Sequence, residues 1–330
     1  MKEAKVRLVV EAGVSFAIVN NPGLRHFAQQ MILIGAKHGN VAVDDVVYGP
    51  HTVRNAVFRK MSECQELIKT NVATSAQEKA VSFCTDITTD DVNKNSYSDF
   101  TVFWVENWKL RHAMYKCENM PERHTAENIK KFIDKNLEEL GLSLNDTPCT
   151  TDKGSNVIAA TKSKVHVDCV CHRLNTVIDT AWRKVMSFDT EIKHLNEFSH
   201  DLVRYVNQAS GVQSNLPTTL KHGGETRPWR SLIGMFASIS QSRDALFREL
   251  KIRKKEHLIA RLDVDLLNEV VTFLSVFPTL FDMLEYANVA TLQNALPVFY
   301  TLYEGRQLQA SDSEKVALMK REFLKVLNDR

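Results

Sequence analysis

The sequence predicts an α/β protein, in which a mixed sheet is preceded by a helical domain and followed by an all-helical domain. Two observations carry this prediction. Apolar residues recur at helical spacing over residues 1–79 and again over residues 186–330. Between these regions, residues 80–185 alternate short β-prone runs with helical segments, in the order β-β-β-α-β-α-β-α. We therefore expect three domains: 1–79, 80–185 and 186–330.

The first domain is expected to contain at least two helices. Pro22 suits the first turn of one helix, and apolar positions that include Phe27 and Met31 follow it at helical spacing. A second, longer helix is expected over residues 52–79. These helices carry few strong core signals of their own, so we expect them to pack on another domain or on another subunit.

The middle domain supplies the strands. In chain order we expect strands over residues 81–85, 97–105, 108–116, 147–151 and 165–170. Thr125 can cap the helix that follows the third strand, and Gly141 can end it. A short helix from Asn156 and a long helix over 174–185 complete the unit. Such an order predicts a mixed sheet with helices on its faces.

Composition limits the class of protein. The chain of 330 residues is 44% hydrophobic and 25% charged, with a net charge of +2, which is ordinary for a globular protein. It has no run of eighteen apolar residues, so no membrane span is expected. The six cysteines lack the density and spacing of a secreted disulfide scaffold, which predicts reduced thiols in the cytosol or the nucleus.

Two aspartates are candidate metal ligands. Asp86 and Asp152 each end a short β-prone run. Carboxylates on neighbouring strand ends can hold Mg²⁺ or Mn²⁺, because these hard cations prefer oxygen ligands and can support phosphoryl transfer. An alternative stays open, since aspartates are also common at strand ends as turn residues; Asp90 and Asp91 are interpreted in that way. A third carboxylate is expected downstream, and we find none.

The segment that follows the fifth strand contains Cys169, Cys171 and His172. A zinc site is not expected, because four ligands are needed and the sequence has no second paired cluster. Cys171 and His172 are adjacent, so on a strand they would point to opposite faces. That orientation disfavours a thiolate–imidazole nucleophile pair.

Two basic segments are candidate DNA contacts. The first groups Lys251, Arg253, Lys254 and Lys255, which can bind phosphates or simply form a solvated helix face. The second is the segment that contains Arg227, Trp229 and Arg230. There the indole can stack on an unpaired base while the arginines contact phosphates, or it can pack at the start of a helix.

Five motifs together resemble the hAT superfamily of transposases, which includes the hobo, Activator and Hermes elements. They occur in the family's order and approximate spacing at residues 83–91 (FCTDITTDD), 124–129 (HTAENI), 151–156 (TDKGSN), 169–175 (CVCHRLN) and 226–229 (TRPW). The resemblance covers at least residues 80–235. It extends over residues 11–70, which look like the helical segment that precedes the catalytic domain in Hermes-type members.

The resemblance implies a ribonuclease-H-like catalytic domain that a helical insertion interrupts after the fifth strand. Asp86 and Asp152 match the first two catalytic acids, and Cys169 and His172 match the family's Cys-x-x-His element, which supports the active site. Trp229 resembles the insertion-domain tryptophan that stacks on a flipped base. The third acid, a glutamate beyond the insertion, has no counterpart here. We therefore expect an insertion domain that is incomplete and that leaves apolar surface exposed.

Two departures from the family pattern affect this interpretation. Thr88 stands where the family usually has tryptophan, and Pro228 interrupts the usual Thr-Arg-Trp. We expect a nuclear, transposase-derived protein that binds DNA and self-associates, and that cannot cleave DNA because the third acid is missing. A small-molecule substrate is not expected. Two alternatives stay open: an active Mg²⁺- or Mn²⁺-dependent DNA transposase of which this is a fragment, and a domesticated protein-interaction scaffold.

Overall fold

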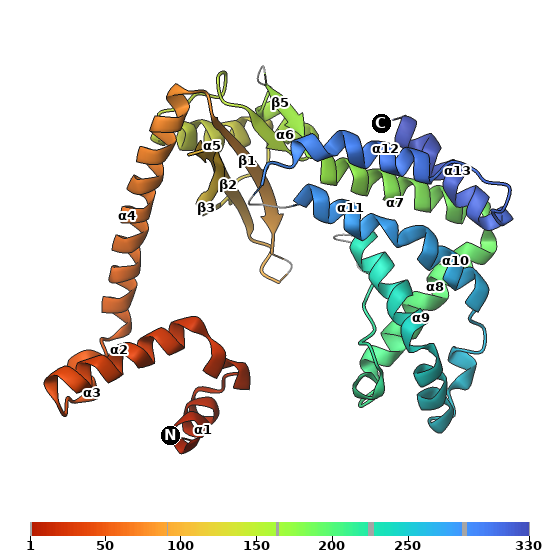
Figure 1. Ribbon diagram of the computed structural model, residues 1–330, viewed down its shortest axis with the longest axis horizontal. Coiled ribbons are helices and arrows are strands. Elements are labelled where there is room, and N and C mark those ends of the chain that lie inside the picture. Colours follow the sequence, from red (N-terminus) through yellow and green to blue (C-terminus); the bar gives the residue numbers. More distant parts are fainter. Residues whose placement is uncertain (1, 91, 163–164, 224–227, 286–288, 330) are drawn as a thin grey trace. The chain divides into compact units, whose positions relative to one another are not determined.

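The computed structural model describes the chain apart from residues 1, 91, 163–164, 224–227, 286–288 and 330, and apart from the side chains of Lys2, Pro228 and Trp229 (Figure 1). The chain divides into two compact units, Met1–Glu66 and Leu67–Arg330. The long helix α4 (Pro50–Gln77) contributes residues to both units.

The first unit is helical. Besides the first part of α4 it contains α1 (Lys2–Ala12), η1 (Phe16–Asn20), α2 (Pro22–His38) and α3 (Val43–Val46). Asn21 caps α2, because its Oδ1 accepts hydrogen bonds from the N–H groups of Gly23 (2.9 Å) and Leu24 (3.1 Å). Among the described side chains of residues 3–66, none is buried. This unit therefore has no hydrophobic core of its own in a single chain.

A five-stranded sheet begins the second unit. Its strands are β1 (Val81–Thr89), β2 (Ser96–Glu106), β3 (Lys109–Asn119), β4 (Cys149–Thr151) and β5 (His166–Asp168). Their order in the sheet is β3-β2-β1-β4-β5. β2 pairs antiparallel with both β1 and β3, whereas β4 pairs parallel with β1 and β5. The prediction of a mixed sheet with this chain order is confirmed.

One face of the sheet packs against α5 (Ala126–Glu139). Phe83 of β1 stacks on Phe100 of β2 at a ring-centroid distance of 4.9 Å, and both lie in one buried cluster with Ile129 and Ile133 of α5. As predicted, α5 begins at a cap, since Thr125 Oγ1 accepts a hydrogen bond from the Asn128 N–H (3.3 Å). Gly141 follows its end with a φ of 70°, which glycine adopts without a Cβ clash.

Two strand predictions differ from the structure at their ends. β1 continues to Thr89, because its backbone stays paired with β2 as far as Ser96. The sequence predicted Asp86 at the end of this strand, but the structure places it inside β1. β5 stops at Asp168, and the long helix α7 (Val170–Phe188) begins two residues later. The predicted strand 165–170 is therefore too long at its end, and the prediction that Cys171 and His172 point to opposite faces of a strand is wrong, because both lie on α7.

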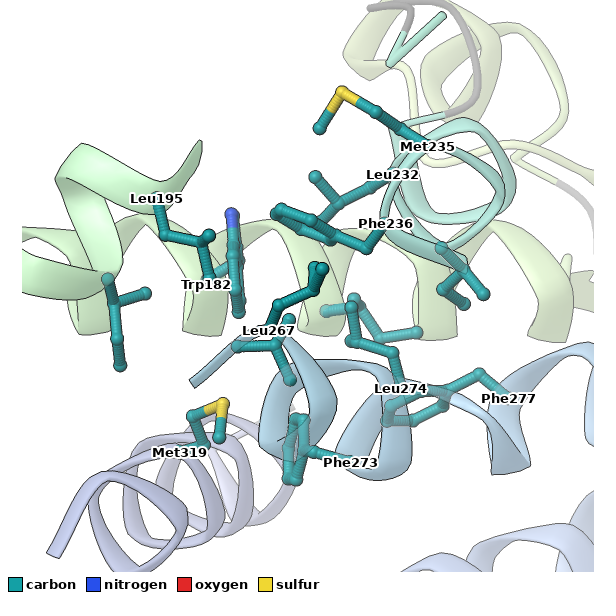
Figure 2. Packing of buried hydrophobic residues seen from close by; sticks show 14 of the residues in the cluster. Trp182, Leu195, Leu232, Met235, Phe236, Leu267, Phe273, Leu274, Phe277 and Met319 are labelled. Atoms are coloured by element: carbon teal, nitrogen blue, oxygen red, sulfur yellow. The ribbon is translucent and has the colours of Figure 1, made fainter. Parts of the chain in front are cut away.

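The rest of the second unit is helical wherever the structure describes it. After α6 (Ser155–Ala160) and α7 come α8 (Thr190–Gln208), η2 (Gln213–Asn215), α9 (Pro228–Ile252), η3 (Glu256–Leu258), α10 (Val264–Leu274), α11 (Val276–Glu285), η4 (Leu292–Asn294), α12 (Ala295–Gly305) and α13 (Glu314–Asn328). Figure 2 shows their common core, in which Trp182 of α7 meets Phe236 of α9 edge to face, with ring centroids 5.8 Å apart. Apolar side chains also remain exposed on this part, including Leu296 (62%) and Tyr300 (56%).

One described segment, Val264–Glu285, is long and apolar enough to cross a bilayer by length and composition alone. It comprises α10 and α11. Leu267, Val270 and Phe277 of these helices are buried in the helical core. Packing inside the protein therefore accounts for the apolar character of this segment.

Candidate active site

Asp86 lies on β1, and Asp152 directly follows β4, the neighbouring parallel strand. Cys84 of β1 pairs with Thr150 of β4, and each aspartate follows two residues later. Alternate residues of a strand point to opposite faces, so both aspartates belong to the face opposite the buried Thr85 and Thr151. The two backbones are therefore one strand spacing apart, about 5 Å, at the carboxyl ends of this pairing.

Each carboxylate keeps one oxygen available. Asp86 Oδ1 accepts a hydrogen bond from the Ile87 N–H (2.8 Å), and Asp152 Oδ1 accepts one from the Gly154 N–H (3.1 Å). Within the described part of the chain, neither Oδ2 accepts a hydrogen bond. Two such oxygens offer a divalent cation two hard ligands.

A third carboxylate belongs to this cluster, and the sequence analysis missed it. Asp99 of β2 lies opposite Asp86, and its Oδ1 accepts the Asp86 N–H at 2.9 Å. Burial raises the pKa of the Asp99 carboxyl. The hydrogen bond from the Asp86 N–H lowers this pKa, whereas the charge of the Asp86 carboxylate raises it further. The available signal was a single acid in the apolar run 97–105.

The carboxylates are not a preformed three-ligand site. Among the residues that the structure describes, no group of three His, Cys, Asp or Glu side chains is arranged to hold one metal ion. The donor chemistry of Asp86 and Asp152 fits Mg²⁺ or Mn²⁺, but only as part of a coordination shell.

Cys169 and His172 lie beside this cluster at the start of α7. Cys169 is the N-terminal cap residue, and its N–H donates to the Thr151 carbonyl at 2.8 Å, next to Asp152. His172 follows three residues later, so the two side chains are neighbours on the helix. The nearby Cys171 thiol and then the backbone N–H groups of His172 and Cys171 lower the pKa of the Cys169 thiol, although burial opposes them.

Other thiols nearby are held in the neutral form. The contact with Cys169 and burial raise the pKa of Cys171, to which the Glu285 charge adds. Burial, followed by the charges of Asp99 and Cys169, raises the pKa of Cys84 to about 12. Only Cys169 of these three is therefore a candidate thiolate at neutral pH.

A separate cavity of about 560 Å³ lies next to this region. Its walls are mainly apolar side chains of α7 and α12, with His166, Asp168 and Arg173 among its polar residues. Neither Asp86 nor Asp152 lines it, so this cavity is not the site of the carboxylate chemistry.

The predicted DNA contacts fall into two places at opposite ends of α9, which has 25 residues and is therefore about 37 Å long. At its start, Arg230 forms ion pairs with Asp282 (3.0 Å) and Glu285 (2.7 Å) of α11. Arg230 and Glu285 also both act on the Cys171 pKa, so this end of α9 faces the start of α7. Arg227 and the Trp229 side chain lie outside the described residues.

At the other end of α9, four basic side chains are exposed: Lys251, Arg253, Lys254 and Lys255. Arg253 donates a hydrogen bond to the Ser210 carbonyl at 2.8 Å, whereas the three lysines project into solvent. The structure therefore does not bring the two predicted groups of DNA contacts together.

Comparison with known proteins gives one informative match. No family profile matches the chain. The chain is 24% identical over 320 residues to the transposable element Hobo transposase of Drosophila melanogaster, and this match covers 96% of the chain and 48% of the relative. The chain is a distant homologue of this hAT-family transposase. It spans about half the length of the Hobo transposase.

The homology to a hAT transposase includes every part of the chain that carries a candidate residue. Its 96% coverage takes in β1, β4 and the start of α7, which together position Asp86, Asp152 and Cys169. The hAT resemblance inferred from five short motifs is confirmed as distant homology along almost the whole chain.

Proposed function

We propose that this chain is a transposase-derived protein that binds DNA and carries a ribonuclease-H-like catalytic-type domain at residues 80–185. The observation that supports this most is the homology over 96% of the chain, within which Asp86 on β1 and Asp152 directly after β4 each follow two residues after the paired Cys84 and Thr150. The strand order β3-β2-β1-β4-β5, in which β2 alone runs opposite to the others, is consistent with such a domain.

Asp86 and Asp152 would hold the divalent metal ion. Mg²⁺ or Mn²⁺ bound there would polarise a phosphate oxygen and favour deprotonation of the attacking water. Asp99 would influence this site through its charge, since it is half-buried beside Asp86. Cys169 and His172 would act as positioning residues, because the Cys169 backbone ties the start of α7 to β4 at Thr151.

In our proposal the 330-residue chain does not cleave DNA by itself. Two carboxylates can bind a metal ion weakly, but phosphoryl transfer with two ions needs a shell in which both metal positions are filled. The experiment is incubation with supercoiled plasmid and Mn²⁺. No nicking is expected. Metal-dependent nicking that disappears in Asp152→Ala would overturn this part and favour the alternative, an active transposase centre.

DNA binding would use the exposed end of α9. Lys251, Lys254 and Lys255 are exposed and can neutralise phosphates, so affinity should fall steeply with salt and depend little on sequence. The test is fluorescence anisotropy of a labelled duplex over a salt series. Replacing the three lysines with alanine should reduce the slope of log K against log salt by about 2 to 3. An unchanged slope would remove this segment from the interface.

Self-association is proposed for the first unit. Its helices expose apolar side chains, such as Phe16 (84%), Ile32 (61%) and Val57 (61%), and residues 3–66 bury none. Helices of this kind gain their stability from packing of an apolar face, and a second copy of the chain would supply it. Action on DNA places the protein in the nucleus in this proposal. The same exposed apolar face also suits the alternative of a protein-interaction scaffold, in which a different protein binds to this face.

A further inference from the structure

The turn between β2 and β3 has an unusual residue. Asn107 and Trp108 form a two-residue connection, since Glu106 pairs with Lys109 on either side of it. Both have positive φ, 50° for Asn107 and 61° for Trp108. Hairpin turns of this kind prefer Asn followed by Gly, because glycine has no Cβ to clash in the left-handed region. A tryptophan there is strained.

Trp108 is also the most exposed large apolar side chain in the described part of the chain. Its exposure is 98%, whereas Trp104 and Trp182 are each 7% exposed. The molecule thus combines two unfavourable features at one position, a strained backbone and a fully solvated indole. Within the described part of the chain, no packing around the Trp108 side chain compensates for these features, whereas a contact outside the chain would.

The surroundings of Trp108 favour an anionic partner. Lys109 and Arg111 follow it on β3, and both are exposed. The exposed Lys79 lies at the same end of the sheet, because the Val105 N–H donates to the Ala80 carbonyl at 3.1 Å. Glu106 holds the Arg111 guanidinium by an ion pair of 3.2 Å, which fixes its position beside the turn.

We propose that this hairpin tip is a second DNA contact, in which the Trp108 indole stacks on an unpaired base while Lys79 and Lys109 contact the flanking phosphates. An aromatic face combined with adjacent cations is how proteins bind single-stranded nucleic acid without reading its sequence. The inference rests on the proposed DNA-binding function. Asp99 precedes Trp108 by nine residues along an extended strand, so this contact lies about 30 Å from the carboxylates.

The test compares single-stranded and duplex binding by Trp108→Gly, Trp108→Phe and the wild-type chain. The probes are a fluorescein-labelled oligo(dT) of twenty nucleotides and a labelled mixed-sequence duplex. Binding is measured by the fluorescence anisotropy of each probe. Trp108→Gly should lower the affinity for oligo(dT) about tenfold, because one base–aromatic stack is lost, with a much smaller effect on duplex. Trp108→Phe should keep most of the affinity. Phe188→Ala, at a similarly exposed residue (68%), is the matched control and should change nothing.

Misfolding cannot mimic this result, because glycine suits the positive φ at this position and the melting temperature of Trp108→Gly should not fall below that of wild type. Unchanged oligo(dT) affinity in Trp108→Gly, with duplex binding intact in wild type, overturns this inference alone. Loss of self-association in Trp108→Gly without loss of oligo(dT) affinity overturns it in favour of a protein contact. A wild-type chain that binds neither probe overturns both this inference and the proposed DNA binding.

Discussion

At the scale of single residues, Asp99 is the side chain whose titration should be visible in stability. Its pKa is raised, so the folded chain binds this proton more tightly than the unfolded chain does. Stability should therefore fall as pH rises from the ordinary aspartate range, near 4, through the raised value. The stabilising contribution of Asp99 protonation is complete below the ordinary aspartate pKa and is lost above the raised pKa of the folded chain.

Asp99→Asn removes the charge and keeps the shape. We expect the variant to be slightly more stable than wild type at pH 7.5, by less than about 1 kcal/mol, and equal to it at low pH. The measurement is urea unfolding at several pH values. A variant that is less stable at pH 7.5, with an unchanged pH profile, would show that the hydrogen bonds of Asp99 matter more than its charge.

Sequence reasoning found Asp86 and Asp152 but not Asp99. The first two each end a short β-prone run in the sequence, and a carboxylate at such a position is noticeable. Asp99 lies within the β-prone run 97–105, and its relation to Asp86 arises only through the cross-strand register. A register between two strands depends on the whole hairpin, so the run 97–105 alone could not reveal this neighbour.

At the scale of elements, Asp189 joins the start of α8 to α13. Its Oδ1 accepts hydrogen bonds from the N–H groups of Glu191 (2.9 Å) and Ile192 (3.0 Å), and its Oδ2 pairs with Lys315. Although burial acts in the opposite direction, Lys315 and these N–H groups lower the pKa of Asp189. Its stabilising contribution is therefore complete above the ordinary aspartate pKa and is lost as pH falls through the lowered value.

Asp189→Ala should cost about 2 to 3 kcal/mol of unfolding free energy at pH 7, because it removes a helix cap and leaves Lys315 without its best partner. Lys315→Met keeps the cap and should cost only about 1 kcal/mol. Thermal unfolding measures both variants. Equal losses would mean that the cap contributes nothing beyond the ion pair.

Element types were predictable here, whereas several ends were not. The cap Thr125 and the stop at Gly141 are local signals, and both bound α5 in the structure. The end of β1 depends on its pairing with β2. The strand β5 ends at Asp168, because the next residue, Cys169, is the N-terminal cap residue of α7. Tertiary pairing and capping geometry decided these ends, and neither is contained in the pattern of a single segment.

At the scale of the whole molecule, residues 3–66 should depend on association. Ile32→Asp together with Leu33→Asp places charges on exposed apolar positions of α2 (61% and 52%). If a second copy covers this face, the double variant should be monomeric in light scattering, while the melting of residues 67–330 stays unchanged. Matched Lys37→Asp, on the same helix, should leave association intact. Identical light-scattering masses for wild type, the double variant and Lys37→Asp would contradict self-association through this face of the first unit.

The pairing of Asp86 and Asp152 as metal ligands is the central proposal for this molecule. Titration with Mn²⁺, followed by electron paramagnetic resonance of the free ion, tests it directly. Saturable binding is expected, and Asp86→Asn and Asp152→Asn should each weaken it about tenfold. Asp201→Asn, which alters an exposed aspartate paired with Arg204 at 2.6 Å on α8, should leave it unchanged. Binding that is equal in all four proteins, or no binding in wild type, would contradict the claim that these two carboxylates form a metal centre.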